Sequence, residues 1–149
     1  MTAPIEEVIS QSVAETEAIA GKLAATLAGG ECIALQGDLG AGKTQFVRGL
    51  VRGLGGNTAA VSSPTFVLLH VYQGGRLTVY HLDAYRVAGP EDFESIGFPE
   101  LLEQGGVVIV EWARRVESLL PSNCIWIDIE PIAENERKIT IRRGNACSE

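Results

Sequence analysis

This chain of 149 residues is poor in cysteine and has no long hydrophobic run. Its three cysteines are odd in number and far apart, at 32, 124 and 147. That pattern indicates core filling and excludes a disulfide framework or a zinc cluster. No apolar stretch approaches the roughly 20 residues of a membrane span, and the first nine residues lack the basic segment of a signal peptide. We therefore expect a cytoplasmic protein without a membrane segment.

Positive charge is also scarce. Lys and Arg number 12 against 19 Asp and Glu, which gives a formal net charge of −7. Because such a surface repels a phosphate backbone, direct tight binding of nucleic acid is not expected. There is no internal repeat, low-complexity tract or linker, and the length predicts one domain over residues 1–149 that buries roughly 70% of its unfolded surface.

Residues 37–44 read Gly-Asp-Leu-Gly-Ala-Gly-Lys-Thr and complete the phosphate-binding pattern G-x-x-x-x-G-K-[ST]. An apolar run at 32–35 predicts the buried strand before the loop, and apolar residues at helical spacing over 45–51 predict the helix after it. The backbone N–H groups would cradle a β-phosphate, while Lys43 reaches the β- and γ-oxygens and Thr44 ligates Mg²⁺. The predicted nucleotide contacts in this segment are Asp38, Leu39, Gly40, Ala41, Gly42, Lys43 and Thr44.

The rest of the pattern mixes helices and strands. A capping-box sequence at Ser12 begins a predicted helix over 13–28, and a shorter helix is predicted from 90 to 96. Runs at 66–72 and 77–82, joined by a turn at 73–76, predict an antiparallel hairpin. A second fully buried strand is expected at 107–110, and two closing strands, paired with each other, at 123–129 and 137–142.

Three further segments carry candidate chemistry, each with a plainer alternative. Glu111 ends the buried strand at 107–110, as a metal- or water-directing carboxylate does in P-loop folds, although many strands simply end on an acid. Asp83 is a candidate second carboxylate for Mg²⁺ in a segment that otherwise reads as a polar strand end. Thr65 lies where switch loops sense a γ-phosphate, or in an ordinary Ser-Pro turn. Trp112 is either core or an aromatic plate beside the nucleotide.

Taken in order, GDLGAGKT, SSPTF, HLDAYR and VVIVEW resemble the TsaE family, a group of small ATPases of bacterial tRNA threonylcarbamoyladenosine synthesis. The resemblance covers nearly the whole chain. It implies a single-domain α/β P-loop NTPase whose central mixed, mostly parallel sheet is flanked by helices and an antiparallel hairpin. It also implies a Mg²⁺-dependent ATPase, weak without its partners, that acts on TsaB and TsaD homologues and meets tRNA only through that complex.

Residue by residue, the resemblance implies that Lys43 is the phosphate lysine, and that Thr44, Glu111 and Asp83 serve the metal. It makes Thr65 the switch-like threonine. It also adds two nucleotide contacts remote from the loop, Ser12 and Arg137.

The sequence departs from the family where EWP is Glu111-Trp112-Ala113 and where DLYR is Asp83-Ala84-Tyr85-Arg86. Neither change removes a charge, so we expect altered packing and retained hydrolysis. Two other functions fit the residues alone. A small-molecule kinase would use the same P-loop with Arg114 and Arg115, and a non-catalytic nucleotide-binding module would need no more than the P-loop. A guanine-nucleotide switch is less favoured because the chain has no N-K-x-D motif.

Overall fold

The computed structural model describes residues 5–37, 42–61, 69–85 and 90–143. Within those ranges the strands are β1 (Ile5–Ser10), β2 (Cys32–Gln36), β3 (Leu69–Tyr72), β4 (Val79–Asp83), β5 (Val107–Glu111), β6 (Ile125–Ala133) and β7 (Glu136–Arg143). The α-helices are α1 (Val13–Ala24), α2 (Lys43–Gly53), α3 (Pro90–Ser95) and α4 (Phe98–Leu102), and the 3-10 segments are η1 (Thr58–Ala60) and η2 (Ala113–Leu119). None of these helices is long and apolar enough to cross a bilayer.

The strands of the described ranges form one sheet in the order β1-β7-β6-β2-β5-β4-β3. Its middle is parallel, since β2 pairs in parallel with both β6 and β5, and β4 pairs in parallel with β5. Both margins are antiparallel, through the β3–β4 hairpin on one side and the β6–β7 and β1–β7 pairs on the other. The predicted mixed sheet, parallel in its central strands, is confirmed.

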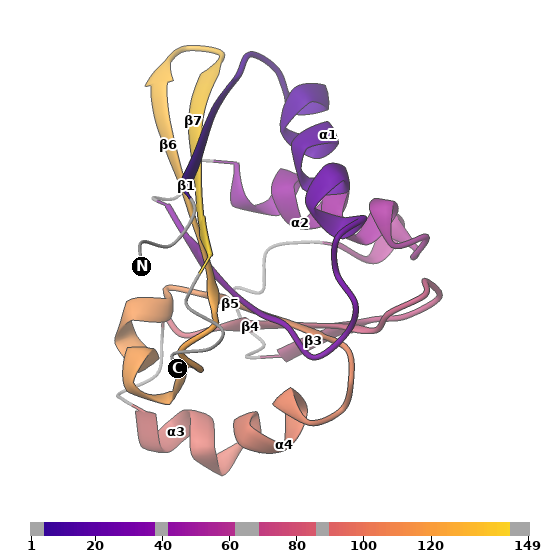
Figure 1. Cartoon of the computed structure of the whole chain (residues 1–149), viewed down its shortest axis with the longest axis vertical. Coiled ribbons are helices and arrows are strands. Elements are labelled where there is room, and N and C mark those ends of the chain that lie inside the picture. The colour runs from indigo at the N-terminus through magenta and orange to yellow at the C-terminus, as the bar shows by residue number, and fades with distance from the viewer. Residues whose placement is uncertain (1–4, 38–41, 62–68, 86–89, 144–149) are drawn as a thin grey trace.

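Helices cover both faces of the central strands (Figure 1). α1 and α2 pack on one face against side chains such as Leu35, Ile109 and Ile127, whereas α3, α4 and η2 pack on the other against Ala34 and Val110. Successive residues of a strand point to opposite faces, so a strand buried on both must be apolar throughout. This explains why the runs at 32–35 and 107–110 were recognisable as strands.

The cysteines described by the structure behave as core residues. Cys32 and Cys124 are both buried free thiols. The pKa of Cys32 lies well above its ordinary value, because its thiol is in hydrogen-bonding contact with Cys124 and because it is buried. The prediction of core filling is confirmed for these two, and Cys147 lies outside the described residues.

Two predicted boundaries needed correction, and some elements were not predicted. The first helix ends at Ala24, not at 28, because Ala28 and Gly29 donate their N–H groups to the Glu31 carboxylate in a turn that leads directly into β2. The hairpin strand expected from 77 begins at Val79. β1 and the five-residue helix α4 were not predicted at all, and residues 66–68 of the other hairpin strand lie outside the described ranges. The 3-10 segments η1 and η2 were not predicted either, and the remaining strands and α-helices agree with their predicted positions at their cores.

Candidate nucleotide site

The strand and the helix expected on either side of the phosphate-binding motif are both present. The strand ends at Gln36, and α2 begins at Lys43 after Gly42, whose φ of 108° is a left-handed conformation that glycine adopts without strain. α2 therefore points its N-terminal N–H groups towards the loop, as anion-binding helices do. The predicted contacts Asp38, Leu39, Gly40 and Ala41 lie outside the described residues, and so does Thr65.

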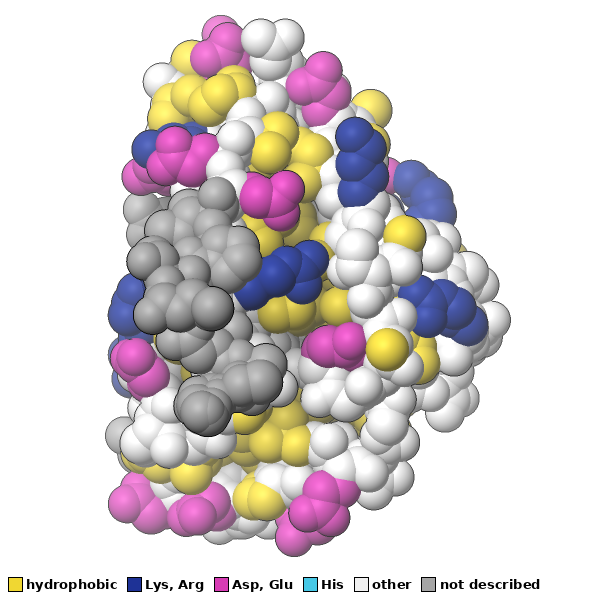
Figure 2. All heavy atoms as spheres, viewed as in Figure 1, with side chains coloured by type: hydrophobic (Ala, Val, Ile, Leu, Met, Phe, Trp, Pro, Cys, Tyr) yellow, Lys and Arg dark blue, Asp and Glu magenta, His cyan; other side chains and the backbone are white. Residues whose placement is uncertain are grey.

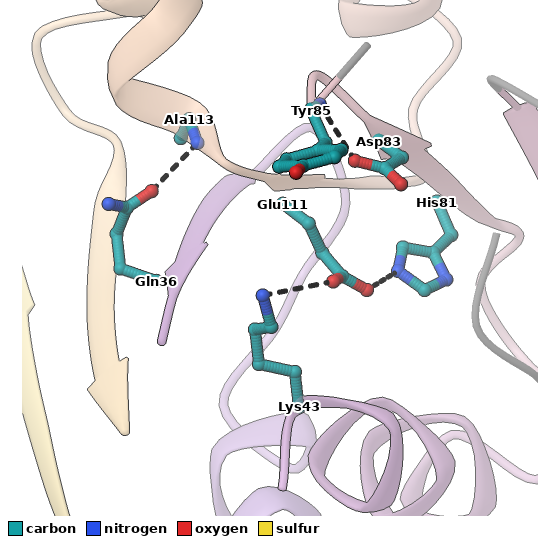
Figure 3. Close-up of polar contacts among 7 residues, drawn as sticks. All are labelled: Gln36, Lys43, His81, Asp83, Tyr85, Glu111 and Ala113. Atoms are coloured by element: carbon teal, nitrogen blue, oxygen red, sulfur yellow. Dashed lines mark hydrogen bonds and ion pairs between the residues drawn. The ribbon is translucent and has the colours of Figure 1, made fainter. Parts of the chain in front are cut away.

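Lys43 and Glu111 form a buried ion pair at the centre of this region (Figure 3). Lys43 Nζ lies 3.5 Å from Glu111 Oε1, and the two residues are only 6% and 5% exposed. The other carboxylate oxygen, Oε2, lies 2.6 Å from Nε2 of His81. The strand-end acid and the loop lysine, predicted separately, thus meet directly.

The environment of Glu111 favours its charged form. Burial alone would raise its pKa, but the hydrogen bond and charge of His81, together with the charge of Lys43, outweigh burial and lower the pKa below its ordinary value. The carboxylate is therefore ionised at neutral pH. Its full negative charge lies at the end of β5 and could orient a metal ion or a water molecule there.

Asp83 lies beside this pair in a different environment. β4 and β5 are parallel, and Asp83 is the direct register partner of Glu111. Its Oδ1 accepts the N–H of Tyr85 at 2.8 Å, and Figure 3 shows its carboxylate turned towards that residue. Its pKa is raised, first by burial and also by the negative charge of Glu111.

The oxygen-rich residues suit Mg²⁺ only in company with a nucleotide. Among the described residues, no three His, Cys, Asp or Glu side chains are grouped to hold a metal by themselves. Mg²⁺, however, keeps several waters and is usually bound through one or two carboxylates plus substrate phosphates. The Thr44 hydroxyl, Asp83 and Glu111 offer the hard oxygen ligands that such an arrangement requires.

Trp112 lies in the site and is only partly buried. Of the described residues it is the only one other than glycine with positive φ, at 58°, a conformation that costs a non-glycine residue roughly 1–2 kcal/mol. This sharp turn after β5 brings the indole over Lys43, with Nζ 4.5 Å from the ring centroid, and against the ring of Tyr85 at 4.8 Å. A hydrogen bond of 2.7 Å from Ala113 N–H to Gln36 Oε1 ties the same turn to the end of β2. The indole also packs against the buried core cluster that includes Ala113 and Val116, and its place beside a nucleotide stays a prediction.

The two remote residues implied by the family resemblance, Ser12 and Arg137, lie together beside the N-terminus of α2. Ser12 caps α1 and Arg137 begins the pairing of β7 with β1, yet both line one cavity of about 120 Å³ with Gly42. Sequence reasoning did not identify the other lining residues, which carry no recognisable motif: Val13, Thr16, Gln45, Glu134 and Asn135. Sequence reasoning also assigned no role to His81, although this residue begins the HLDAYR segment that carries part of the family resemblance.

A buried lysine at the start of a helix, facing a strand-end glutamate across parallel strands, is the arrangement of the P-loop class of α/β proteins. Within that class the chain belongs to the TsaE family, because residues 10–139 match the family model described as "Threonylcarbamoyl adenosine biosynthesis protein TsaE". The resemblance inferred from the motifs is thereby confirmed. It places the protein in tRNA threonylcarbamoyladenosine biosynthesis.

Individual relatives agree with the family model. The chain is 45% identical over 132 residues to the tRNA threonylcarbamoyladenosine biosynthesis protein TsaE of Treponema pallidum, covering 89% of this chain and 94% of the relative. It is 43% identical over 126 residues to the Bacillus subtilis protein of the same name, covering 85% and 78%. The crystal structure of YdiB from B. subtilis superposes with a TM-score of 0.81 at 33% identity, covering 97% of this chain and 89% of that one.

Proposed function

We propose that this protein hydrolyses ATP to ADP and phosphate as an accessory protein of tRNA threonylcarbamoyladenosine modification. It acts on the complex of TsaB and TsaD homologues and does not transfer the threonylcarbamoyl group itself. The observation that carries the proposal is the buried Lys43–Glu111 pair at the end of the P-loop strand unit. The pair supports the proposal because it brings into direct contact the cation proposed to bind the phosphates and the carboxylate proposed to serve the metal or the water.

In this mechanism the chain contributes position and charge. Lys43 leaves Glu111 for the β- and γ-oxygens, and the N-terminal N–H groups of α2 hold the phosphates. Glu111 then orients the attacking water or the water shell of the metal. Thr44, Asp83 and Glu111 would hold Mg²⁺, which when bound neutralises charge on the triphosphate. The cavity lined by Ser12 and Arg137 receives the rest of the nucleotide.

The charge distribution supports a protein partner, with tRNA reached only indirectly. On the face seen in Figure 2, acidic side chains lie at both ends and also among the basic side chains of its middle. The net charge of −7 opposes binding to an RNA backbone, while the basic residues near the site suit a triphosphate. The relatives are named for tRNA threonylcarbamoyladenosine biosynthesis, the pathway to which the proposed TsaB and TsaD partners belong.

ATP hydrolysis by the purified protein, alone and with the TsaB and TsaD homologues of the same organism, tests the proposal. We expect Mg²⁺-dependent turnover that rises with the partners and falls at least about 100-fold in Lys43→Ala. Lys22→Ala, the same change at an exposed lysine of α1, is the matched control and should behave as wild type. If Lys43→Ala hydrolyses ATP as fast as the wild type, the assignment of this site to ATP hydrolysis is refuted. ADP production that needs a small-molecule acceptor would indicate a kinase, and tight nucleotide binding without turnover would indicate a binding module.

A further inference from the structure

Behind Glu111 the structure contains a buried chain of polar side chains for which the proposed function gives no role. Tyr72 hydroxyl lies 3.2 Å from His81 Nδ1, and His81 Nε2 lies 2.6 Å from Glu111 Oε2. His81 is fully buried, and Tyr72 and Glu111 are 4% and 5% exposed. The three residues come from β3, β4 and β5, neighbouring strands of the sheet.

Strand geometry explains why these side chains meet. His81 and Asp83 are two residues apart on β4 and therefore point to the same face, and Val79, the register partner of Tyr72, shares it. On β5, Glu111 shares a face with Ile109, which packs in the core beneath α1 and α2. Tyr72, His81 and Glu111 thus all face α2, the helix that carries Lys43.

The protonation of these three side chains decides which group donates each hydrogen bond. An ionised carboxylate only accepts hydrogen bonds, so Nε2 of His81 must carry the proton that reaches Oε2. The Tyr72 hydroxyl is hydrogen-bonded to the other ring nitrogen, Nδ1, so the imidazole is held from both sides. Carboxylates and imidazoles at reaction centres are commonly oriented by such outer partners, whose loss costs about 10–100-fold in activity or metal affinity.

The two oxygens of Glu111 therefore have different partners. Oε2 is held by His81, which is fixed in the sheet, whereas Oε1 faces Lys43, whose side chain moves to the phosphates if the proposed function is correct. Once Lys43 has moved, His81 is the neighbour that still fixes the carboxylate.

We propose that His81, supported by Tyr72, is a positioning residue for ATP hydrolysis. It holds Glu111 by Oε2 so that Oε1 is left to direct the attacking water or the water shell of the metal. This inference rests on the proposed function and adds to it separate roles for the two carboxylate oxygens of Glu111. It also explains why a histidine occupies a strand position that is otherwise surrounded by apolar core.

Three variants test the inference. His81→Phe keeps the ring volume but removes the donor to Glu111, His81→Gln keeps an N–H donor near the position of Nε2, and Tyr72→Phe removes only the hydroxyl. Matched controls are His70→Gln, which alters the chain's other histidine, and Tyr80→Phe, which alters a tyrosine of β4. Steady-state hydrolysis with the partner proteins gives kcat and KM, and equilibrium ATP binding and the unfolding midpoint are measured on the same samples.

We expect His81→Phe to lower kcat about 10–100-fold while KM and ATP affinity change less than about threefold, because the phosphate-binding groups are untouched. His81→Gln should restore kcat to within about fivefold of wild type, and Tyr72→Phe should lower it about 3–10-fold. Both controls should keep wild-type kcat. A purely structural role would instead lower the unfolding midpoint without this split between kcat and KM.

A folded His81→Phe variant with wild-type kcat would overturn the inference and leave the ATPase standing. Equal loss in His81→Gln and His81→Phe would overturn it as well. If His81→Phe does not fold, Tyr72→Phe decides, since an unchanged kcat there is the overturning result. Absence of hydrolysis in the wild-type protein with its partners would refute the proposed function and this role together.

Discussion

Asp83 and Glu111 lie directly opposite each other on parallel strands, yet the pKa of one carboxyl is raised and that of the other is lowered. Glu111 has His81 and Lys43 as partners, which overcome the effect of burial. For Asp83, burial and the neighbouring negative charge of Glu111 raise the pKa by more than the hydrogen bond from one backbone N–H lowers it. The charged form of Glu111 is thus stabilised by its surroundings, whereas the charged form of Asp83 is destabilised by its surroundings. A destabilised buried charge is typical of a functional site.

Replacing Asp83 by Asn should separate stability from activity. The amide oxygen can keep the bond from the Tyr85 N–H while the buried charge is removed, so we expect the free energy of unfolding at neutral pH to rise by about 0.5–1 kcal/mol. The pKa of Asp83 is raised in the folded protein, so the cost of its charge is absent below the ordinary value of 3.8 and is complete once pH has risen through the folded pKa. The stability difference between Asp83→Asn and wild type should therefore vanish below pH 3.8. ATP hydrolysis should fall at least about tenfold. Urea unfolding at several pH values measures the first effect, and a variant less stable than wild type at neutral pH would contradict it.

Glu111→Gln should show the opposite dependence on pH. The lowered pKa of Glu111 means that its ion pairs stabilise the fold fully above the ordinary value of 4.5 and lose that effect as pH falls through the folded pKa. We expect the variant to be about 1.5–3 kcal/mol less stable at neutral pH, with the difference from wild type shrinking below pH 4.5. The exposed Glu117→Gln, measured in parallel, should change stability by less than about 0.5 kcal/mol. A difference that grows on acidification would rule out this account.

Trp112 should report nucleotide binding optically. Its indole lies over Lys43, so movement of that charge to a triphosphate changes the field at the ring. The chain's other tryptophan, Trp126, is replaced by Phe to isolate the signal. ATP should then produce a saturable change in emission, and the same protein carrying Lys43→Ala should give none. Saturable ATP binding without any spectral change would show that Lys43 does not leave the indole.

The crossing of α1 and α2 predicts opposite effects for two helical glycines. A Cβ at Gly49 would lie 2.5 Å from the Cα of Glu17, so Gly49→Ala must push the helices apart and should cost about 3 kcal/mol. A Cβ at Gly21 would lie 3.9 Å from its nearest neighbour, the Gly49 carbonyl, and Gly21→Ala should stabilise by about 0.5–1 kcal/mol through helix propensity. Thermal unfolding of both variants checks the pair. Equal shifts of the same sign would mean that the helices do not pack as described.

Much of the fold was predictable because its signals are local. The buried strands β2 and β5 read as apolar runs, and the β6–β7 pair was found from two patterned segments near the end of the chain. β1 was missed since Glu6 and Glu7 make it locally polar, and its pairing partner β7 lies far along the chain. The helix end at Ala24 was misjudged because the turn that follows is held by the Glu31 carboxylate, which lies beyond the predicted helix.

The site was predictable in part for the same reason. Lys43 and Glu111 belong to motifs, whereas Ser12 and Arg137 were assigned to the nucleotide only through the family resemblance, since the capping box at Ser12 predicts a helix start and no ligand contact. His81 sits in an apolar strand and shows its partners only when β3, β4 and β5 are side by side.

The order of the residues was sufficient to recognise the P-loop motif, because that motif depends on neighbours within a few positions, and to recognise the family, because its motifs follow one another in a fixed order along the chain. Which oxygen of Glu111 meets His81 and which meets Lys43 depended on the packed sheet and on α2. So did the opposite pKa shifts of Asp83 and Glu111, because burial and contact with a charge exist only after strands distant in the chain have been brought together.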